Sequence, residues 1–114
     1  MSKSTITNEE ISIIQNEMDL LFNEIRDGKH NDWCFPEFPL GWCGKVSEIL
    51  KYRLEKSHGL SEVCYICKEL DQRSHAWIEF KGYIIDLTAF QFDDTLPKKI
   101  FLPKEKSKFH MLFK

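Results

Sequence analysis

The stretch that most constrains the fold of this 114-residue chain is residues 75–88, which reads as a β-hairpin. Lys81-Gly82 supplies a two-residue turn, and apolar and polar side chains alternate on either side of it. Counting outward from the turn makes His75 and Asp86 diagonal neighbours on one face, with Cα atoms about 7–8 Å apart. An imidazole and a carboxylate can join across that gap, so the hairpin predicts a hydrogen bond between these two side chains.

The two faces of this hairpin differ in chemistry. One face is wholly apolar and must pack against a core or a helix, because a one-residue change of register would bury the charges instead. This apolar face carries Ala76, Ile78, Phe80, Tyr83, Ile85 and Leu87. The other face carries His75, Glu79, Asp86 and Thr88, together with Trp77 and Ile84. The pattern therefore predicts a packing face and a chemical face on the same two strands.

Two helices are predicted before the hairpin. Thr7 is a good N-cap, Glu10 completes a capping box, and apolar residues then recur at helical spacing, so the first helix is expected over 8–27. The second helix is expected over 43–56, with Gly59 as its C-terminal stop. Strands are expected over 62–68, 75–80 and 83–88, with a short further strand at 100–102. This order predicts one α+β domain over the whole chain (1–114), with N-terminal helices packed on an antiparallel sheet.

The composition is that of one globular domain. Hydrophobic residues make up 42% and charged residues 30%, and a chain of this length can bury a core without disulfides or a metal. No stretch has signal-peptide or membrane-spanning character, so we expect a complete cytoplasmic protein, or one exported without a cleaved signal, and no membrane partner. In the cytoplasm its four cysteines are expected to be free thiols.

The C-terminal tail is basic, whereas the whole chain has a net charge of −2. Residues 98–114 carry six Lys and one Glu, and such a tail can contact nucleic acid or an acidic partner. Apolar residues within it, among them Phe109, Leu112 and Phe113, favour a tail that packs onto the domain. Nucleic acid is therefore not the expected partner.

Cys43 stands at the start of the second predicted helix. A thiol there meets the positive end of the helix dipole and unpaired backbone N–H groups, and both favour the reactive thiolate. His75 and Asp86 follow on other elements, which is the order of a nucleophile, its base and the residue that orients the base. In this hypothesis the thiolate attacks a carbonyl and the imidazolium protonates the leaving amine.

Neighbouring residues are candidates for the rest of the site. The backbone N–H of Cys43 is one expected oxyanion donor, and Gln91 is a candidate for the second. Ser47 lies one turn beyond Cys43 on a similar helix face. Trp42 and Trp77 either line a substrate cleft or pack in the core. Three other histidines are expected at the surface without partners: His30, His58 and His110.

Together the motifs resemble those of papain-like and transglutaminase-like cysteine enzymes, and most closely small bacterial members such as papain-fold toxin and deamidase domains. The resemblance covers about residues 36–92 and rests on the motifs Phe38-Pro39-Leu40-Gly41-Trp42-Cys43-Gly44 with Ser47 and Leu50, His75-Ala76-Trp77, Gly82-Tyr83-Ile84-Ile85-Asp86-Leu87-Thr88 and Gln91-Phe92. It implies a papain-like fold in which Cys43, His75 and Asp86 form a triad that cleaves, deamidates or transamidates amide bonds. Papain-type proteases carry an oxyanion Gln a few residues before the Cys. Residues 36–40 contain none, which points to a specialised enzyme rather than a general protease.

The sequence therefore predicts a cysteine-dependent amide hydrolase or acyl-transferase that needs no cofactor. A protein glutamine deamidase or a narrow-specificity cysteine peptidase is the expected form, and its partner is a protein or peptide substrate with a glutamine or other amide group. Toxin, effector and housekeeping roles all fit. An alternative is a catalytically inactive interaction module of the same fold, which would bind proteins through aromatic residues of 28–42 and the basic tail.

A second alternative is a small zinc-binding module built on Cys64-x-x-Cys67. Cys34 and His75 would complete its four ligands. A strand, however, places Cys64 and Cys67 on opposite faces, which is poor geometry for chelation. No metal site is therefore predicted.

Overall fold

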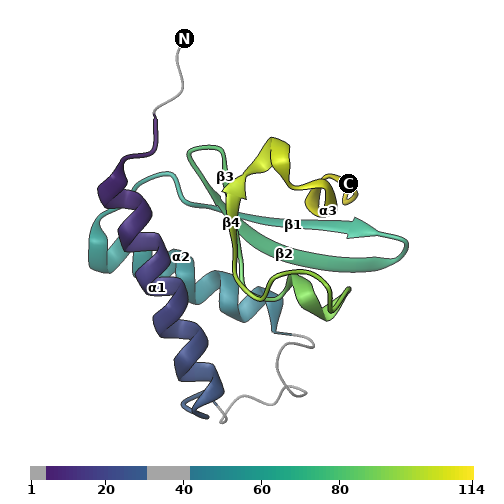
Figure 1. Ribbon diagram of the computed structural model, residues 1–114, viewed down its shortest axis with the longest axis horizontal. Coiled ribbons are helices and arrows are strands. Elements are labelled where there is room, and N and C mark those ends of the chain that lie inside the picture. Colours follow the sequence, from purple (N-terminus) through teal and green to yellow (C-terminus); the bar gives the residue numbers. More distant parts are fainter. Residues whose placement is uncertain (1–4, 31–41) are drawn as a thin grey trace.

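The computed structural model describes residues 5–30 and 42–114, which form helices and a four-stranded antiparallel sheet (Figure 1). The elements are, in chain order, α1 (Asn8–Arg26), α2 (Cys43–His58), β1 (Cys64–Leu70), β2 (Arg73–Phe80), β3 (Tyr83–Asp86), the 3₁₀ turn η1 (Ala89–Gln91), β4 (Ile100–Pro103), the 3₁₀ turn η2 (Lys104–Lys106) and α3 (Lys108–Met111). The expected α+β class is confirmed. Each expected helix and strand is present, with bounds that differ by a few residues.

Both long helices are bounded by the residues that their sequences predict. At the start of α1, Thr7 Oγ1 accepts a hydrogen bond from the Glu10 backbone N–H (3.1 Å), and the Glu10 carboxylate accepts one from the Thr7 N–H (2.9 Å). This capping box satisfies two backbone donors that a helix N-terminus leaves unpaired. After α2, Gly59 adopts the left-handed conformation (φ 69°) that ends many helices and that a side chain would strain.

The sheet is an antiparallel meander in the order β1-β2-β3-β4. Lys81 and Gly82 both have positive φ (50° and 81°), the turn geometry that matches the twist of the flanking strands. Phe80 pairs with Tyr83 across this turn, as predicted. The expected register of the hairpin is therefore confirmed, and so is the assignment of its side chains to two faces.

The helices α1 and α2 lie on one side of the sheet and cover its apolar face (Figure 1). The buried residues of this helix-side core are Ile14, Met18, Leu21 and Ile25 of α1, Trp42, Val46, Leu50 and Leu54 at and within α2, Val63, and Ile78, Phe80, Ile85 and Leu87 of the hairpin. Full burial of one such aliphatic or aromatic side chain contributes about 1.5–3 kcal/mol. The helix-side core is thus hydrophobic, and Ser47 is the polar residue of α2 that is buried beside it.

The C-terminal segment covers the opposite face of the sheet (Figure 1). The buried residues of this tail-side core are Trp77, Ile84, Ala89, Ile100 and Phe113, and Ile66, Leu70, Phe92, Leu96, Leu102 and Phe109 pack against them. The backbone of Lys114 also exchanges hydrogen bonds with Glu69 at the edge of β1 (2.8 and 3.2 Å). The prediction that the basic tail packs onto the domain is confirmed.

Two further expectations concern a membrane span and the aromatic loop. None of the helices in residues 5–30 and 42–114 combines the length and apolar character needed to cross a bilayer. Cys34 and the loop aromatics Trp33, Phe35 and Phe38 lie outside the described residues, so their predicted roles remain predictions.

Candidate active site

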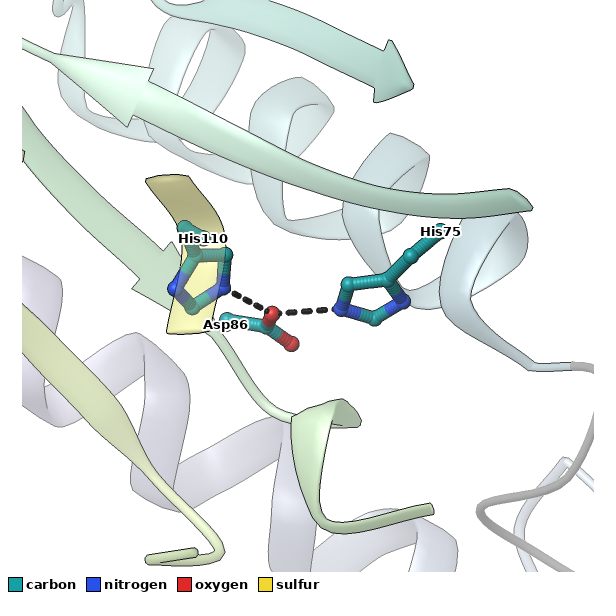
Figure 2. Close-up of side chains that lie close together, drawn as sticks. All are labelled: His75, Asp86 and His110. Carbon is teal, nitrogen blue, oxygen red and sulfur yellow. Dashed lines mark hydrogen bonds and ion pairs between the residues drawn. The ribbon is translucent and has the colours of Figure 1, made fainter. Parts of the chain in front are cut away.

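Asp86 is the centre of a buried polar cluster on the tail-side face. It is the last residue of β3, and only 2% of its surface is exposed. Figure 2 shows one of its carboxylate oxygens, Oδ2, between two imidazole rings. His75 Nε2 on β2 lies 2.6 Å from this oxygen, and His110 Nε2 on α3 lies 2.7 Å from it. The His75–Asp86 hydrogen bond predicted from the hairpin is confirmed, and a second histidine accompanies it.

The other oxygen of Asp86 is also hydrogen-bonded. Oδ1 accepts from the Thr88 backbone N–H (2.8 Å) and from the Thr88 hydroxyl (3.3 Å). Burial raises the pKa of Asp86, but the hydrogen bonds from His110, His75 and Thr88 outweigh it and hold this pKa well below its usual range. The side chain is therefore a carboxylate that only accepts hydrogen bonds.

His75 is fully buried at the junction of β2, β3 and α3. Burial lowers its pKa, but hydrogen bonding to Asp86 and to Cys43 outweighs this and raises the pKa to about 9. Since Nε2 faces the carboxylate, Nδ1 is the ring nitrogen left to exchange a proton with another group. Gln91 of η1 places its side-chain nitrogen 3.4 Å from Nδ1.

Cys43 is the first residue of α2, as predicted, and its side chain is partly buried. Burial raises the pKa of the thiol, but hydrogen bonding to His75, the Ala76 and Gly44 backbones and the charge of His75 outweigh it, so this pKa is lowered. The β2–β3 ladder ends at Ile78, before Ala76 is reached. Cys43 thus interacts both with the His75 side chain and with the backbone of the next residue of β2, Ala76.

Tyr65 of β1 borders the thiol and was not anticipated. A Cβ atom added to Gly44 would come within 3.3 Å of the Tyr65 hydroxyl, so the ring lies against the first turn of α2. Burial and the nearby charges of Cys67, Cys43 and Glu48 raise the pKa of Tyr65. A neutral phenol beside the Cys43 thiol is a hydrogen-bond donor that the spacing of residues could not indicate.

Aromatic rings surround the His75 imidazole and exclude water from it. Trp77, Phe92, Phe109 and Phe113 have ring centroids 5.0–6.0 Å from the His75 centroid. An apolar environment strengthens the hydrogen bond between an imidazole and a carboxylate and makes an unpaired charge costly. The cluster is therefore stable only while each of its polar groups keeps a partner.

The remaining predicted site residues separate into two groups. Gln91 and Trp77 lie beside His75, and the Trp77 Nε1–H donates to Glu79 (3.1 Å). Trp42 and Ser47 are instead buried on the helix side, and Trp42 is part of the helix-side core. Of the two roles considered for Trp42, core packing is the one that this position supports.

The expectation that three histidines lack partners is wrong, and so is the surface position expected of His110, whereas His58 is exposed as expected. His110 is only 4% exposed and hydrogen-bonds Asp86, whereas His30 meets Glu24 (3.0 Å) and His58 meets Glu17 (2.8 Å). His110 and His58 lie 24 and 41 residues from their partners, so only tertiary packing brings these pairs together, whereas His30 lies six residues from Glu24. For His110 the available signal was local. Ser107, the N-cap of α3, and Phe109 and Phe113, spaced one helical turn apart, indicate a packed helix around it.

His75, Asp86 and His110 are also the one group of three potential metal ligands found in residues 5–30 and 42–114. The distances from the two histidine nitrogens to Asp86 Oδ2 are those of hydrogen bonds. Ligand atoms around a tetrahedral zinc ion at 2.0–2.1 Å lie roughly 3.3 Å apart, whereas these nitrogens lie 2.6 and 2.7 Å from Oδ2. Cys64 and Cys67 are both exposed and His75 faces Asp86, so these three residues do not form the ligand set considered in the zinc-binding alternative.

Comparison with known proteins gives no match to any family model, to any curated protein or to any solved structure. The function must therefore be inferred from the geometry of this cluster and from its chemistry.

Proposed function

We propose that the protein is a cysteine-dependent amide hydrolase or acyl-transferase in which Cys43 is the nucleophile, His75 the base and Asp86 the residue that orients the base. A protein glutamine deamidase or a narrow-specificity cysteine peptidase of the papain-like or transglutaminase-like type is the form proposed. One arrangement carries the proposal: the Cys43 side chain hydrogen-bonds the His75 ring, while Asp86 holds Nε2 of that ring at 2.6 Å.

The chemistry follows from the two ring nitrogens. His75 Nδ1 takes the thiol proton, which gives a thiolate–imidazolium pair, and Asp86 stabilises the imidazolium through Nε2. With a glutamine side chain as substrate, the sulfur forms a bond to the amide carbon. The proton on Nδ1 then passes to the departing nitrogen, and ammonia leaves.

The resulting thioester is resolved by water or by an amine. Water adds its hydroxyl group to the carbonyl and gives its proton to His75, and the thiolate leaves as glutamate is released. A lysine amine in place of water gives a transamidated product instead. For either acceptor, backbone N–H groups at the start of α2 are suitably charged to stabilise the oxyanion, because a helix N-terminus carries unpaired donors.

Selective alkylation tests the nucleophile. We expect iodoacetamide at pH 6 to modify Cys43 at least about tenfold faster than Cys64 or Cys67, because only the thiolate reacts. Both reference thiols are exposed and Cys43 is partly buried, so accessibility alone would give the opposite order. The variant His75→Gln should abolish the advantage. Equal rates in the unaltered protein would remove the basis of the proposal and favour the inactive interaction module.

Turnover of a glutamine peptide tests the reaction. We expect N-benzyloxycarbonyl-Gln-Gly to release ammonia and to gain about one dalton in the presence of the protein, and Cys43→Ala to abolish both changes. Added alkylamine should divert part of the product to the transamidated peptide if acyl transfer takes place. Cleavage of casein without ammonia release would support the peptidase instead of the deamidase.

A further inference from the structure

His110 is the one residue of the cluster that the proposed chemistry does not use. It lies on α3, is buried, and places Nε2 2.7 Å from the same Asp86 oxygen that His75 contacts. We propose that His110, supported by Ser107, is a positioning residue that shares Asp86 Oδ2 with His75, fixing the carboxylate and limiting how strongly it holds a protonated His75. This inference rests on the function proposed above.

The proton arrangement follows from the partners of each ring. An ionised carboxylate can only accept, so both His75 Nε2 and His110 Nε2 must carry a hydrogen. In the neutral His110 ring, Nδ1 is then an acceptor, and the Ser107 hydroxyl lies within hydrogen-bond distance to donate to it. Ser107 Oγ also accepts from the His110 backbone N–H (3.4 Å). The ring is thus held at both of its nitrogens.

Because His110 shares Oδ2, Asp86 attracts the protonated His75 ring less strongly than it would alone. Each N–H donor draws charge from Oδ2, so a carboxylate with two donors attracts an imidazolium less than a carboxylate with one. The hydrogen bond from His110 is the largest of the effects that keep Asp86 ionised. Without His110, Asp86 would hold His75 more tightly in its protonated form, which would make His75 a weaker acid toward the departing nitrogen.

Other charged groups surround His75 but do not share this oxygen. Cys43 approaches from α2, and Lys68 of β1 is the cross-strand partner of His75. Arg73, on the same strand as His75, places its guanidinium 4.2 Å from the centre of the Phe92 ring. Thr88 donates to the other oxygen of Asp86, so among the described residues His110 is the group that shares Oδ2 with His75.

The unaltered protein provides the first test. Nitrogen NMR of ¹⁵N-histidine-labelled protein distinguishes the two tautomers of each ring. We expect neutral His110 to carry its hydrogen on Nε2, coupled to the Asp86 carboxylate. A His110 with its hydrogen on Nδ1, or one that exchanges freely between both nitrogens, would overturn the proposal without bearing on whether Cys43 is a nucleophile.

Matched variants provide the second test. The amide nitrogen of Gln reaches about as far as the imidazole Nε2, so His110→Gln keeps a donor to Asp86, whereas His110→Leu removes it. We expect the titration midpoint of His75 to rise by about one pH unit in His110→Leu and glutamine turnover to fall about tenfold, with both restored in His110→Gln. A merely structural histidine would change the unfolding midpoint of both variants and leave the His75 titration in place, which would refute the inference.

Ser107→Ala covers the case in which His110→Leu does not fold. Loss of the hydroxyl frees His110 Nδ1, and we expect the His110 tautomers to mix and the His75 midpoint to rise in part. An unchanged tautomer and midpoint would contradict the role given to Ser107. If Cys43 of the unaltered protein alkylates no faster than Cys64, the proposed function fails, whereas an activated Cys43 with an unmoved His75 midpoint in His110→Leu refutes only this inference.

Discussion

The two faces of the sheet are built from alternate residues of the same strands, yet they hold the fold together in different ways. On the helix side, Ile78 and Ile85 join a hydrophobic core with α1 and α2. On the tail side, their chain neighbours include Trp77 and Asp86, and three titratable side chains are buried among aromatic rings. The comparison teaches that one hairpin can separate the part of a domain that is only packed from the part that can carry chemistry.

The two faces should also differ in how much stability they lose on mutation. A hydrophobic core loses stability in proportion to the side-chain volume that is removed, and its neighbours relax partly around the gap. A buried polar cluster loses far more when one partner goes, because the groups left behind are desolvated and unpaired. The tail-side face should therefore respond sharply to small chemical changes, and the helix-side face should respond mainly to changes of size.

The largest effect is expected for Asp86→Asn. An amide oxygen cannot replace two carboxylate oxygens, and the amide N–H would face an imidazole N–H, so unfolding free energy should fall by about 3–5 kcal/mol in urea denaturation. The alkylation advantage of Cys43 should disappear as well. Glu79→Gln is the matched control, since Glu79 is a less buried carboxylate on the same face that hydrogen-bonds Trp77. An equal loss of unfolding free energy in both variants would refute the central role of Asp86 in the buried cluster.

A slightly smaller effect is expected for Leu54→Ala on the helix side. Leu54 is fully buried, so its truncation should lower the unfolding free energy by about 2–4 kcal/mol. Because the change leaves the polar cluster intact, the rate of Cys43 alkylation at pH 6 should stay unchanged in the folded protein. A loss of alkylation at temperatures where the variant is folded would show that the two faces are coupled.

The next largest effect is expected in the dependence of the unfolding free energy on pH. His75 has a pKa of about 9 in the folded protein against 6.5 as its ordinary value, so it favours folding below pH 6.5 and loses that contribution as pH rises toward 9. The lowered pKa of Cys43 acts in the opposite direction and offsets part of the loss. We expect unfolding free energy to fall by about 2 kcal/mol between pH 6.5 and 9. In His75→Gln this slope should vanish, and a slope that persists would have to come from other groups.

The smallest effect is expected for Thr7→Ala, which removes the cap of α1. The lost hydrogen bond should cost about 1 kcal/mol, measured as a lower urea midpoint with an unchanged slope. Alkylation of Cys43 should not change, because the cap lies on the helix-side face. Thr7→Ser, which keeps a hydroxyl, should be close to the unaltered protein, and a full loss in that variant would argue against the capping hydrogen bond.

Local chemistry determined which parts of the fold could be predicted. The capping box at Thr7, the stop at Gly59 and the turn at Lys81-Gly82 act over a few residues, and each is present as predicted. The hydrogen bond between His75 and Asp86 follows from the register of one turn. Strand ends were less predictable, because Asp86 ends β3 where the backbone turns to place Thr88 on its carboxylate.

The rest of the site depends on contacts between distant segments, which spacing alone does not reveal. His110 reaches Asp86 only because the tail folds across the sheet, and a histidine among lysines looks like a surface residue in the sequence. Tyr65 reaches the first turn of α2, next to Cys43, because β1 and α2 pack together. In both cases the side chain is ordinary in its local sequence, and its partner is set by the tertiary fold.

The positions of two tryptophans give each face its own optical signal. Trp77 has its ring centroid 4.7 Å from that of His110 and 5.6 Å from that of His75, whereas Trp42 lies in the helix-side core. Protonated imidazole quenches indole fluorescence on contact, so Trp77 emission should brighten as the cluster loses its proton. A protein carrying both Trp33→Phe and Trp42→Phe would keep Trp77 as its single tryptophan, so its fluorescence would follow protonation of His75 during turnover without any added dye.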